Sequence, residues 1–175
     1  MSSSPEEVRQ RARGVRLAIF DVDGVMTDGT IYMGEAGEAF KAFNILDGHG
    51  LKMLQAAGVA TAVLSGRSSE AVSRRARELA IGHVLQGIED KVAAFERLRG
   101  GLNLERESCS FMGDDLPDLG VMRLCGFAAA PDNAVDGVKA AAHYVTRARG
   151  GGGAVREFCE LVLRSRGLLE APSPG

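Results

Sequence analysis

The stretch Ile19-Phe20-Asp21-Val22-Asp23-Gly24-Val25-Met26-Thr27-Asp28-Gly29 is the key to the fold of this chain, because three carboxylates follow directly on an apolar run. Residues 15–20 are mostly apolar and end in polar turn residues, so they are predicted to form a buried strand. Asp21 and Asp23 are spaced one residue apart, and a glycine follows them. Carboxylates at the end of a buried strand must be solvated, paired with a cationic side chain or bound to a metal ion.

The composition is that of a single globular domain. The chain has 175 residues, of which 45% are hydrophobic and 25% charged, enough for one core and too few for two ordinary domains. The net charge of −2 gives no broad attraction to nucleic acid or to an anionic membrane, so neither is an expected partner. No apolar run reaches the roughly 18 residues of a membrane span, and the first residues lack a signal-peptide core, so we expect a cytoplasmic protein. Cys109, Cys125 and Cys159 lack metal-binding spacing and are expected to be free, buried thiols.

Short β-rich runs alternate with amphipathic segments along most of the chain. Strands are predicted at residues 15–20, 59–64, 83–85, 109–112, 126–129 and 144–146. Helices are predicted at residues 47–57, 68–80, 90–99, 134–142 and 154–166, with a short helix after residue 115 and a β-hairpin over residues 30–43. This alternation predicts an α/β fold, a Rossmann-like three-layer αβα sandwich with a central parallel sheet. We expect one domain over residues 1–175, with mobile ends at 1–14 and 167–175.

Two groups of acids follow predicted strands, at the edge of a parallel sheet where ligands bind. Asp21 and Asp23 follow the first strand, and Asp114, Asp115 and Asp118 follow the strand at 109–112. Carboxylates gathered at one place repel one another unless a cation neutralises them. Oxygen ligands without histidine or cysteine suit Mg²⁺. The alternative is that these acids belong to turns and helix caps, which are common after strands.

Three further polar residues lie at positions that suit phosphate. Ser65 and Gly66 stand where a strand meets a helix, and a hydroxyl with free N–H groups there forms an anion site. Lys91 begins a later helix, and a lysine there can neutralise phosphate as a point charge. Taken singly, each has an ordinary alternative, a Ser-Gly loop and a solvated surface lysine. Together with the two groups of acids they favour a phosphate site beside a metal site.

The order of these motifs, DxDGVxT, SGR, a lysine and GDDxxD, resembles that of the haloacid dehalogenase superfamily of phosphotransferases over residues 15–166. The resemblance implies that Asp21 is the nucleophile, which forms an aspartyl-phosphate. It implies that Asp23 is the general acid and base, which protonates the leaving alcohol and then activates water. It also implies that the side chains of Asp21 and Asp114, with the backbone carbonyl of Asp23, bind Mg²⁺.

The same resemblance implies roles for the remaining polar residues. Ser65, Gly66 and Lys91 match the residues that hold the phosphate, and Asp115 and Asp118 match acids that support the metal site from behind its ligands. An acid two residues after the nucleophile favours a phosphatase over the dehalogenase branch of the superfamily, because only the phosphatase needs to protonate a leaving group.

The spacing of the motifs leaves no room for a separate cap domain, so a large substrate or another subunit must complete the site. The stretches FNILDGHGLKML, GDDLPDLGVM and HYVTRARGGGGAVREFCELVL are similar to those of the capless 3-deoxy-D-manno-octulosonate 8-phosphate phosphatases, enzymes of lipopolysaccharide inner-core sugar synthesis. This resemblance implies Mg²⁺-dependent hydrolysis of that sugar phosphate by a homotetramer. It also implies that the hairpin lies at subunit contacts and that the glycine-rich C-terminal segment reaches a neighbour's site.

By the same resemblance, Arg67 and Arg75 are candidate contacts for the hydroxyl or carboxylate groups of the substrate, since a guanidinium can bind a carboxylate through two hydrogen bonds. The alternative for Arg75 is a solvated helix face. One departure from the family is the glycine run 151–153, which lacks the arginine often found there.

Three other functions compete with this one. Phosphatases for nine-carbon sialic-type sugar phosphates share nearly all the motifs, but they tend to carry an acid where Arg67 stands. A non-catalytic phosphatase-like oligomerisation module often loses motif residues, whereas this chain keeps them all. A signalling receiver is also an α/β protein with clustered acids, but its phospho-acceptor does not follow the first strand.

Overall fold

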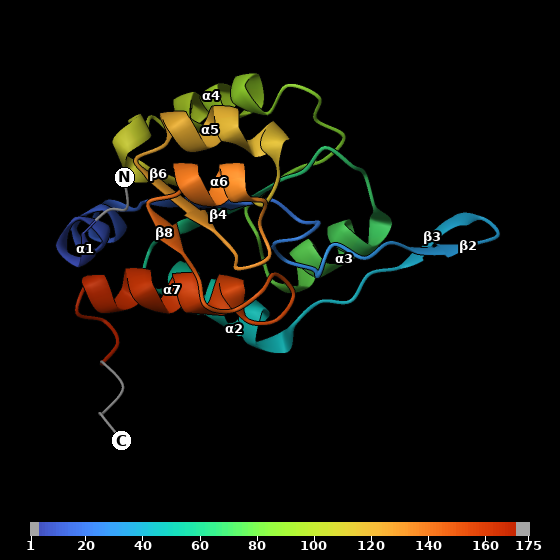
Figure 1. The fold of residues 1–175 in the computed structure, drawn as a ribbon, viewed down its shortest axis with the longest axis horizontal. Helices are drawn as coiled ribbons and strands as arrows, with labels where there is room; N and C mark the ends of the chain where they lie inside the picture. The colour runs from blue at the N-terminus through green and yellow to red at the C-terminus, as the bar shows by residue number, and fades with distance from the viewer. Residues whose placement is uncertain (1–3, 171–175) are drawn as a thin grey trace.

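The computed structural model describes residues 4–170, and a six-stranded parallel sheet forms its centre (Figure 1). The strands lie in the order β5-β4-β1-β6-β7-β8, so the first strand is in the middle. Their bounds are β1 (Leu17–Phe20), β4 (Ala60–Leu64), β5 (His83–Leu85), β6 (Cys109–Met112), β7 (Phe127–Ala130) and β8 (Tyr144–Val145). The chain builds the sheet outward from β1 in both directions, through β4 and then through β6. The change of direction occurs beside β1, which is where open α/β sheets bind ligands.

Helices cover both faces of the sheet, and this explains why β1 is apolar throughout. Ala18 and Phe20 face the core under α1 (Pro5–Gly14), α2 (Ile45–Ala56), α3 (Glu70–Glu78) and α7 (Ala154–Ser165). Leu17 and Ile19 face the core under α4 (Lys91–Gly101), α5 (Leu119–Leu124) and α6 (Asp136–Ala141). A central strand that is buried on both sides has no polar position, so its sequence does not alternate. The three-layer αβα prediction is confirmed.

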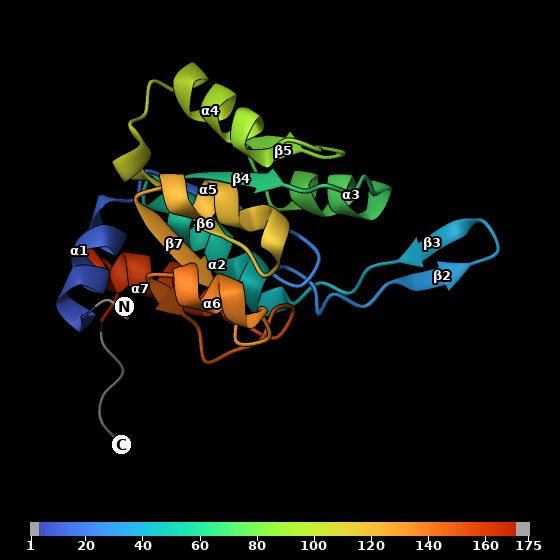
Figure 2. The same cartoon turned by 45° about the horizontal axis from the view of Figure 1, so that its top comes forward.

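The predicted β-hairpin is confirmed and stands away from the body of the protein (Figure 2). It consists of β2 (Tyr32–Gly34) and β3 (Gly37–Phe40), which form a separate antiparallel sheet. Tyr32 and Phe40 stack with ring centroids 4.5 Å apart. This hairpin is the whole insertion between β1 and α2, so residues 4–170 contain no cap domain.

Most of the first segment is helical in the structure, and its expected mobility stays a prediction. Residues 5–14 form α1, which begins with a capping box between Ser4 and Glu7 and buries Val8 and Ala12. These side chains join the core beneath α7. Near the other end, Leu169 also packs against this core. The remaining parts of the expected mobile ends, residues 1–3 and 171–175, lie outside the described residues. The three cysteines are free and buried, as predicted.

Candidate active site

The polar residues at the ends of β1, β4 and β6 lie together because these strands are neighbours in the sheet. Asp21 follows β1, Ser65 follows β4 and Asp114 follows β6 by two residues. Lys91, the first residue of α4, points into the same place. The resulting cleft has a volume of about 330 Å³ and is lined by Asp21, Asp23, Gly29, Ser65, Gly66, Arg67, Lys91, Asp114, Asp115 and Pro117. Nine of these ten residues are polar or glycine, as a site for a charged, hydrated ligand requires.

A buried lysine joins two of the acids. Lys91, whose side chain is 7% exposed, donates from Nζ to Asp21 Oδ2 at 2.9 Å and to Asp118 Oδ1 at 2.6 Å. Burial lowers the pKa of Lys91, but the charges of Asp21 and Asp118 outweigh it, so the pKa is raised and the ammonium stays charged. The surface-lysine alternative is therefore wrong. A fixed cation lies beside the predicted nucleophile, where it opposes the repulsion between a carboxylate and a phosphate.

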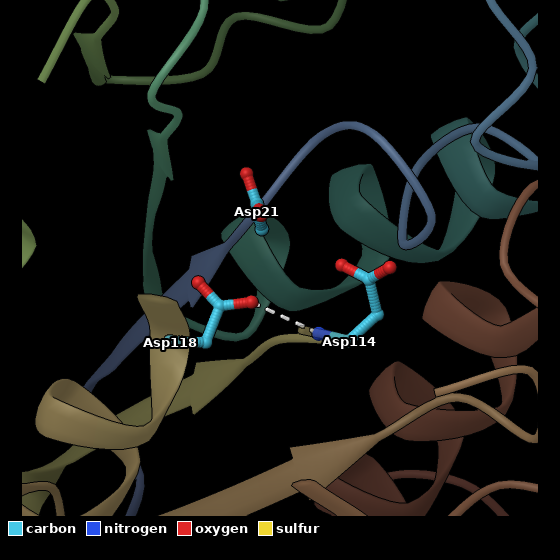
Figure 3. A group of neighbouring side chains, drawn as sticks. All are labelled: Asp21, Asp114 and Asp118. Atoms are coloured by element: carbon cyan, nitrogen blue, oxygen red, sulfur yellow. Dashed lines mark hydrogen bonds between the residues drawn. The ribbon is translucent and has the colours of Figure 1, made fainter. Parts of the chain in front are cut away.

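The acids in the cleft carry more negative charge than Lys91 can balance. Asp21, Asp114 and Asp118 each offer a carboxylate oxygen, and these atoms lie within 4.8 Å of one another (Figure 3). Burial and the charge of Asp118 raise the pKa of Asp21 to about 6, against the opposing effect of Lys91. Burial and the charges of Asp21, Asp118 and Asp115 raise the pKa of Asp114 to about 7. Raised carboxyl pKa values of this kind are typical of a site that is completed by a cation.

The hydrogen bonds separate acids that are free to bind a metal from acids that support them. Both oxygens of Asp118 are engaged, one by Lys91 and the other by the backbone N–H of Asp114 at 3.0 Å (Figure 3). Asp115 is exposed and caps the short 3-10 helix that begins at Leu116, through a hydrogen bond of 2.8 Å. The Asp114 carboxylate accepts none of the hydrogen bonds found within residues 4–170. The oxygen-only donor set and the unbalanced charge fit a hard divalent cation at Asp21 and Asp114, with Asp118 as a support.

The backbone after the nucleophile passes very close to this metal-binding position. Gly24 has φ of +85°, a conformation that side chains disfavour, and a Cβ at this residue would overlap Asp114 Oδ2. A glycine is therefore required for the turn and for the space that Asp114 occupies. This explains the glycine that follows the two acids in the sequence.

The loop after β4 provides the predicted anion-binding groups. Ser65 is buried, and its Oγ accepts a hydrogen bond of 3.3 Å from the backbone N–H of Arg67. Gly66 is exposed and lines the cleft. The Ser65 hydroxyl and the Gly66 backbone line the same cleft as the acids, which suits the binding of a phosphoryl group there.

Asp23 belongs to a charge network that the sequence did not reveal. Lys41, whose side chain is 2% exposed, lies 2.5 Å from Asp23 Oδ1 and 3.0 Å from Glu38 Oε2. Arg67 Nε lies 3.5 Å from Asp23 Oδ2, and its Nη2 lies 3.2 Å from Glu38. Glu38 also accepts from the hydroxyl of Ser69 at 2.6 Å. Lys41 follows the hairpin in a segment without a recognisable motif, and only the packing of the hairpin base brings it to Asp23.

Arg75, unlike Arg67, is not among the residues that line this cleft. It pairs with Glu78 at 3.2 Å on α3 and lines a neighbouring cavity of about 570 Å³ together with Lys41 and Phe43. Its Nε is buried without a hydrogen-bond partner within residues 4–170. The two predicted substrate arginines therefore lie in different cavities of the chain.

Comparisons with known proteins agree with this geometry. A profile of haloacid dehalogenase-like hydrolases matches residues 81–157. The 3-deoxy-D-manno-octulosonate 8-phosphate phosphatase KdsC of Yersinia pestis is 44% identical over 165 residues, which cover 94% of this chain and 88% of that protein. The structure of the phosphatase of the same name from Moraxella catarrhalis, in complex with a magnesium ion, a phosphate ion and a KDO molecule, is 41% identical with a TM-score of 0.91 and covers 94% of each chain. The cobalt-bound form of the deoxy-D-mannose-octulosonate 8-phosphate phosphatase from Haemophilus influenzae is 37% identical with a TM-score of 0.88, over 90% of this chain and 92% of that one.

The strand-end acids, the buried lysine and these matches define a haloacid dehalogenase-like hydrolase. Within that class, the chain belongs to the KdsC family of 3-deoxy-D-manno-octulosonate 8-phosphate phosphatases. The resemblance drawn from the sequence motifs is confirmed at both levels. Among the helices of residues 4–170, none has the length and apolar character that crossing a bilayer would require.

Proposed function

We propose that this protein is a Mg²⁺-dependent phosphatase that hydrolyses 3-deoxy-D-manno-octulosonate 8-phosphate to the free sugar and phosphate, in the synthesis of the inner-core sugar of lipopolysaccharide. The observation that carries the proposal is the contact of Lys91 with Asp21, whose carboxylate lies within 4.8 Å of those of Asp114 and Asp118. The Moraxella catarrhalis relative, with its magnesium ion, phosphate ion and KDO molecule, supports the choice of metal and of substrate.

Asp21 is the proposed nucleophile. One of its carboxylate oxygens attacks phosphorus, a new O–P bond forms, and the bond between phosphorus and the sugar oxygen breaks. Lys91, 2.9 Å from Asp21 Oδ2, reduces the repulsion between the carboxylate and the phosphate dianion. Ser65 and the Gly66 backbone, which line the same cleft, hold the phosphoryl oxygens.

Asp23 is the proposed general acid and base. It gives its proton to the departing sugar oxygen and then takes a proton from the water that hydrolyses the aspartyl-phosphate. That water forms a bond to phosphorus, the bond from Asp21 to phosphorus breaks, and inorganic phosphate leaves with Asp21 restored. Lys41 and Arg67 contact the Asp23 carboxyl group and orient it in the cleft.

Mg²⁺ would be held by the carboxylates of Asp21 and Asp114 and by the backbone carbonyl of Asp23, and it would neutralise the charge that gathers there during phosphoryl transfer. Asp118 would hold the ligand loop in place through the backbone N–H groups of Asp114 and Asp115, at 3.0 and 3.3 Å. Arg67, with a side chain 48% exposed at the cleft, is the proposed contact for the substrate carboxylate.

We further propose that the protein acts as a homotetramer in the cytoplasm, with the hairpin at subunit contacts. The hairpin exposes large apolar side chains, including Met33 at 68% and Phe40 at 57%. Exposed apolar residues on a projecting element are typical of a protein–protein contact. Arg75 lies outside the cleft, so its proposed contact with the substrate requires a neighbouring subunit that joins the Arg75 cavity to a substrate site.

The test is phosphate release with Mg²⁺ across a panel of sugar phosphates: 3-deoxy-D-manno-octulosonate 8-phosphate, a nine-carbon ulosonate 9-phosphate and simple hexose phosphates. A clear preference for the octulosonate is the expected result. Equal, weak activity on all of them would reject the substrate but keep the phosphatase chemistry. No release from any of them would instead favour a non-catalytic module. Activity that survives dilution to a monomer would contradict a shared site.

A further inference from the structure

The turn that follows Asp21 and Asp23 is bound from behind by the side chain of Asn133. Asn133, in the loop after β7, donates from Nδ2 to the carbonyl of Gly24 at 3.0 Å. Its Oδ1 accepts from the backbone N–H of Gly150 at 2.6 Å. An amide is the side-chain group that offers both a donor and an acceptor in one plane. Asn133 therefore joins two loops that are more than a hundred residues apart in the sequence.

These loops pack so closely that a shift in one must move the other. A Cβ at Gly150 would overlap the carbonyl oxygen of Gly24, and a Cβ at Gly24 would overlap Asp114 Oδ2. The glycine segment, the turn and the Asp114 carboxylate are thus stacked directly on one another. Gly24 also follows Asp23 in the chain, so the position of its peptide influences where the Asp23 carbonyl lies.

The glycine segment is itself firmly attached to the body of the protein. Gly151 donates its N–H to Val25 at 3.1 Å. At the far end of the segment, the buried Asp47 carboxylate of α2 accepts from the backbone N–H of Arg156, in the first turn of α7, at 2.8 Å. This cross-helix cap replaces the side-chain cap that α7 lacks at Gly153. Residues 150–153 therefore form a fixed support behind the turn.

We propose that Asn133 is a positioning residue for the metal site: it ties the turn that presents Asp23 and faces Asp114 to the fixed glycine segment, and so keeps the ligands at the spacing that Mg²⁺ requires. Mg²⁺ demands a near-octahedral arrangement at short distances and tolerates little displacement of its ligands. This inference rests on the proposed Mg²⁺ site, and its test measures the binding of Mg²⁺ alone, without turnover.

The test compares Asn133→Ala with wild type by isothermal titration calorimetry with MgCl₂, and by thermal unfolding in EDTA. The matched control is Gln55→Ala, since Gln55 is also half-buried and its amide donates to Thr61 at 2.8 Å and to the carbonyl of Ala80 at 3.3 Å, away from the cleft. Loss of the Asn133 clamp is expected to weaken Mg²⁺ binding by about tenfold. The control is expected to leave the Mg²⁺ dissociation constant unchanged, whatever its effect on stability.

Kinetics separate positioning from folding. In Asn133→Ala the Mg²⁺ concentration for half-maximal phosphate release should rise by a similar factor, while kcat at saturating Mg²⁺ falls much less. An unchanged Mg²⁺ dissociation constant with only a lower melting temperature would overturn the proposal.

If Asn133→Ala does not fold, Asn133→Asp provides the test. The aspartate keeps the acceptor for the Gly150 N–H but places an oxygen against the Gly24 carbonyl. Weaker Mg²⁺ binding supports positioning, and unchanged or tighter binding overturns it. Wild type that binds no Mg²⁺ would reject the metal site itself, which is a different failure.

Discussion

Replacing Asp114 by asparagine is expected to stabilise the metal-free protein while it weakens the binding of Mg²⁺. Burial and three neighbouring carboxylates raise the pKa of Asp114 from 3.8 to about 7. The folded chain therefore holds a proton that the unfolded chain has released, and the free energy of unfolding falls as the pH rises between these two values. Above pH 7 the folded protein carries the full cost of a charged Asp114, which asparagine removes at nearly constant shape.

A pKa raised from 3.8 to about 7 corresponds to roughly 4 kcal/mol at pH 8. The carboxylate is partly exposed, so solvent screens it, and we expect Asp114→Asn to gain about 2 kcal/mol. The assay is urea unfolding at pH 8 in EDTA and again with excess Mg²⁺. Mg²⁺ at about a hundred times its dissociation constant should stabilise wild type by about 2.7 kcal/mol, and the variant by much less.

The control for this experiment is Asp115→Asn, the same substitution at the next residue. Asp115 is exposed, and an asparagine can still accept the hydrogen bond from the backbone N–H of Leu116. It should raise the urea midpoint in EDTA far less than Asp114→Asn does, because Asp115 has the smallest of the three carboxylate effects on the pKa of Asp114, and it should keep most of the gain with Mg²⁺. The pH series adds a second check, because the stability advantage of Asp114→Asn over wild type in EDTA should grow from pH 4 to pH 8. If Asp114→Asn is no more stable than wild type at pH 8 in EDTA, the acids are not under the electrostatic strain inferred from their burial.

Three further predictions concern the same cleft. Asp21→Asn should abolish phosphate release without lowering the urea midpoint, and retained turnover would exclude Asp21 as the nucleophile. Lys91→Met should lower phosphate release about a hundredfold and cost about 3 kcal/mol in urea unfolding, since Asp21 and Asp118 lose their buried cation; near-normal turnover would contradict its role. Gly24→Ala should abolish the calorimetric signal of Mg²⁺ binding, because its Cβ would overlap Asp114 Oδ2 at a φ of +85°; normal Mg²⁺ binding would show that Asp114 moves freely.

The sequence was sufficient for the fold and for the residues at the strand ends. An apolar run with no polar position, followed by acids and a glycine, predicts a central parallel strand that ends in a ligand site, and β1 has that role. Parallel strands all present their carboxyl ends at one edge of the sheet. Asp21, Ser65 and Asp114 each follow a predicted strand, so they are predicted to lie together at that edge. The sequence over 5–14 is compatible with a helix but does not decide one, because its buried apolar residues are only Val8 and Ala12, which pack beneath α7.

Other features depend on contacts that no local pattern encodes. Lys41 reaches Asp23 through the base of a hairpin, Asn133 reaches Gly24 across 109 positions, and Arg75 lies in a neighbouring cavity instead of the cleft. Periodicity and turn chemistry specify which segments form strands and helices, because those depend on neighbours within a few residues. The partner of a buried polar side chain is chosen by packing among distant segments, where an unmet hydrogen bond or charge costs more than any local preference. For that reason the strand-end acids could be predicted from the sequence. Lys41, which contacts Asp23, and Asn133, which binds the Gly24 turn, could be identified only in the folded chain.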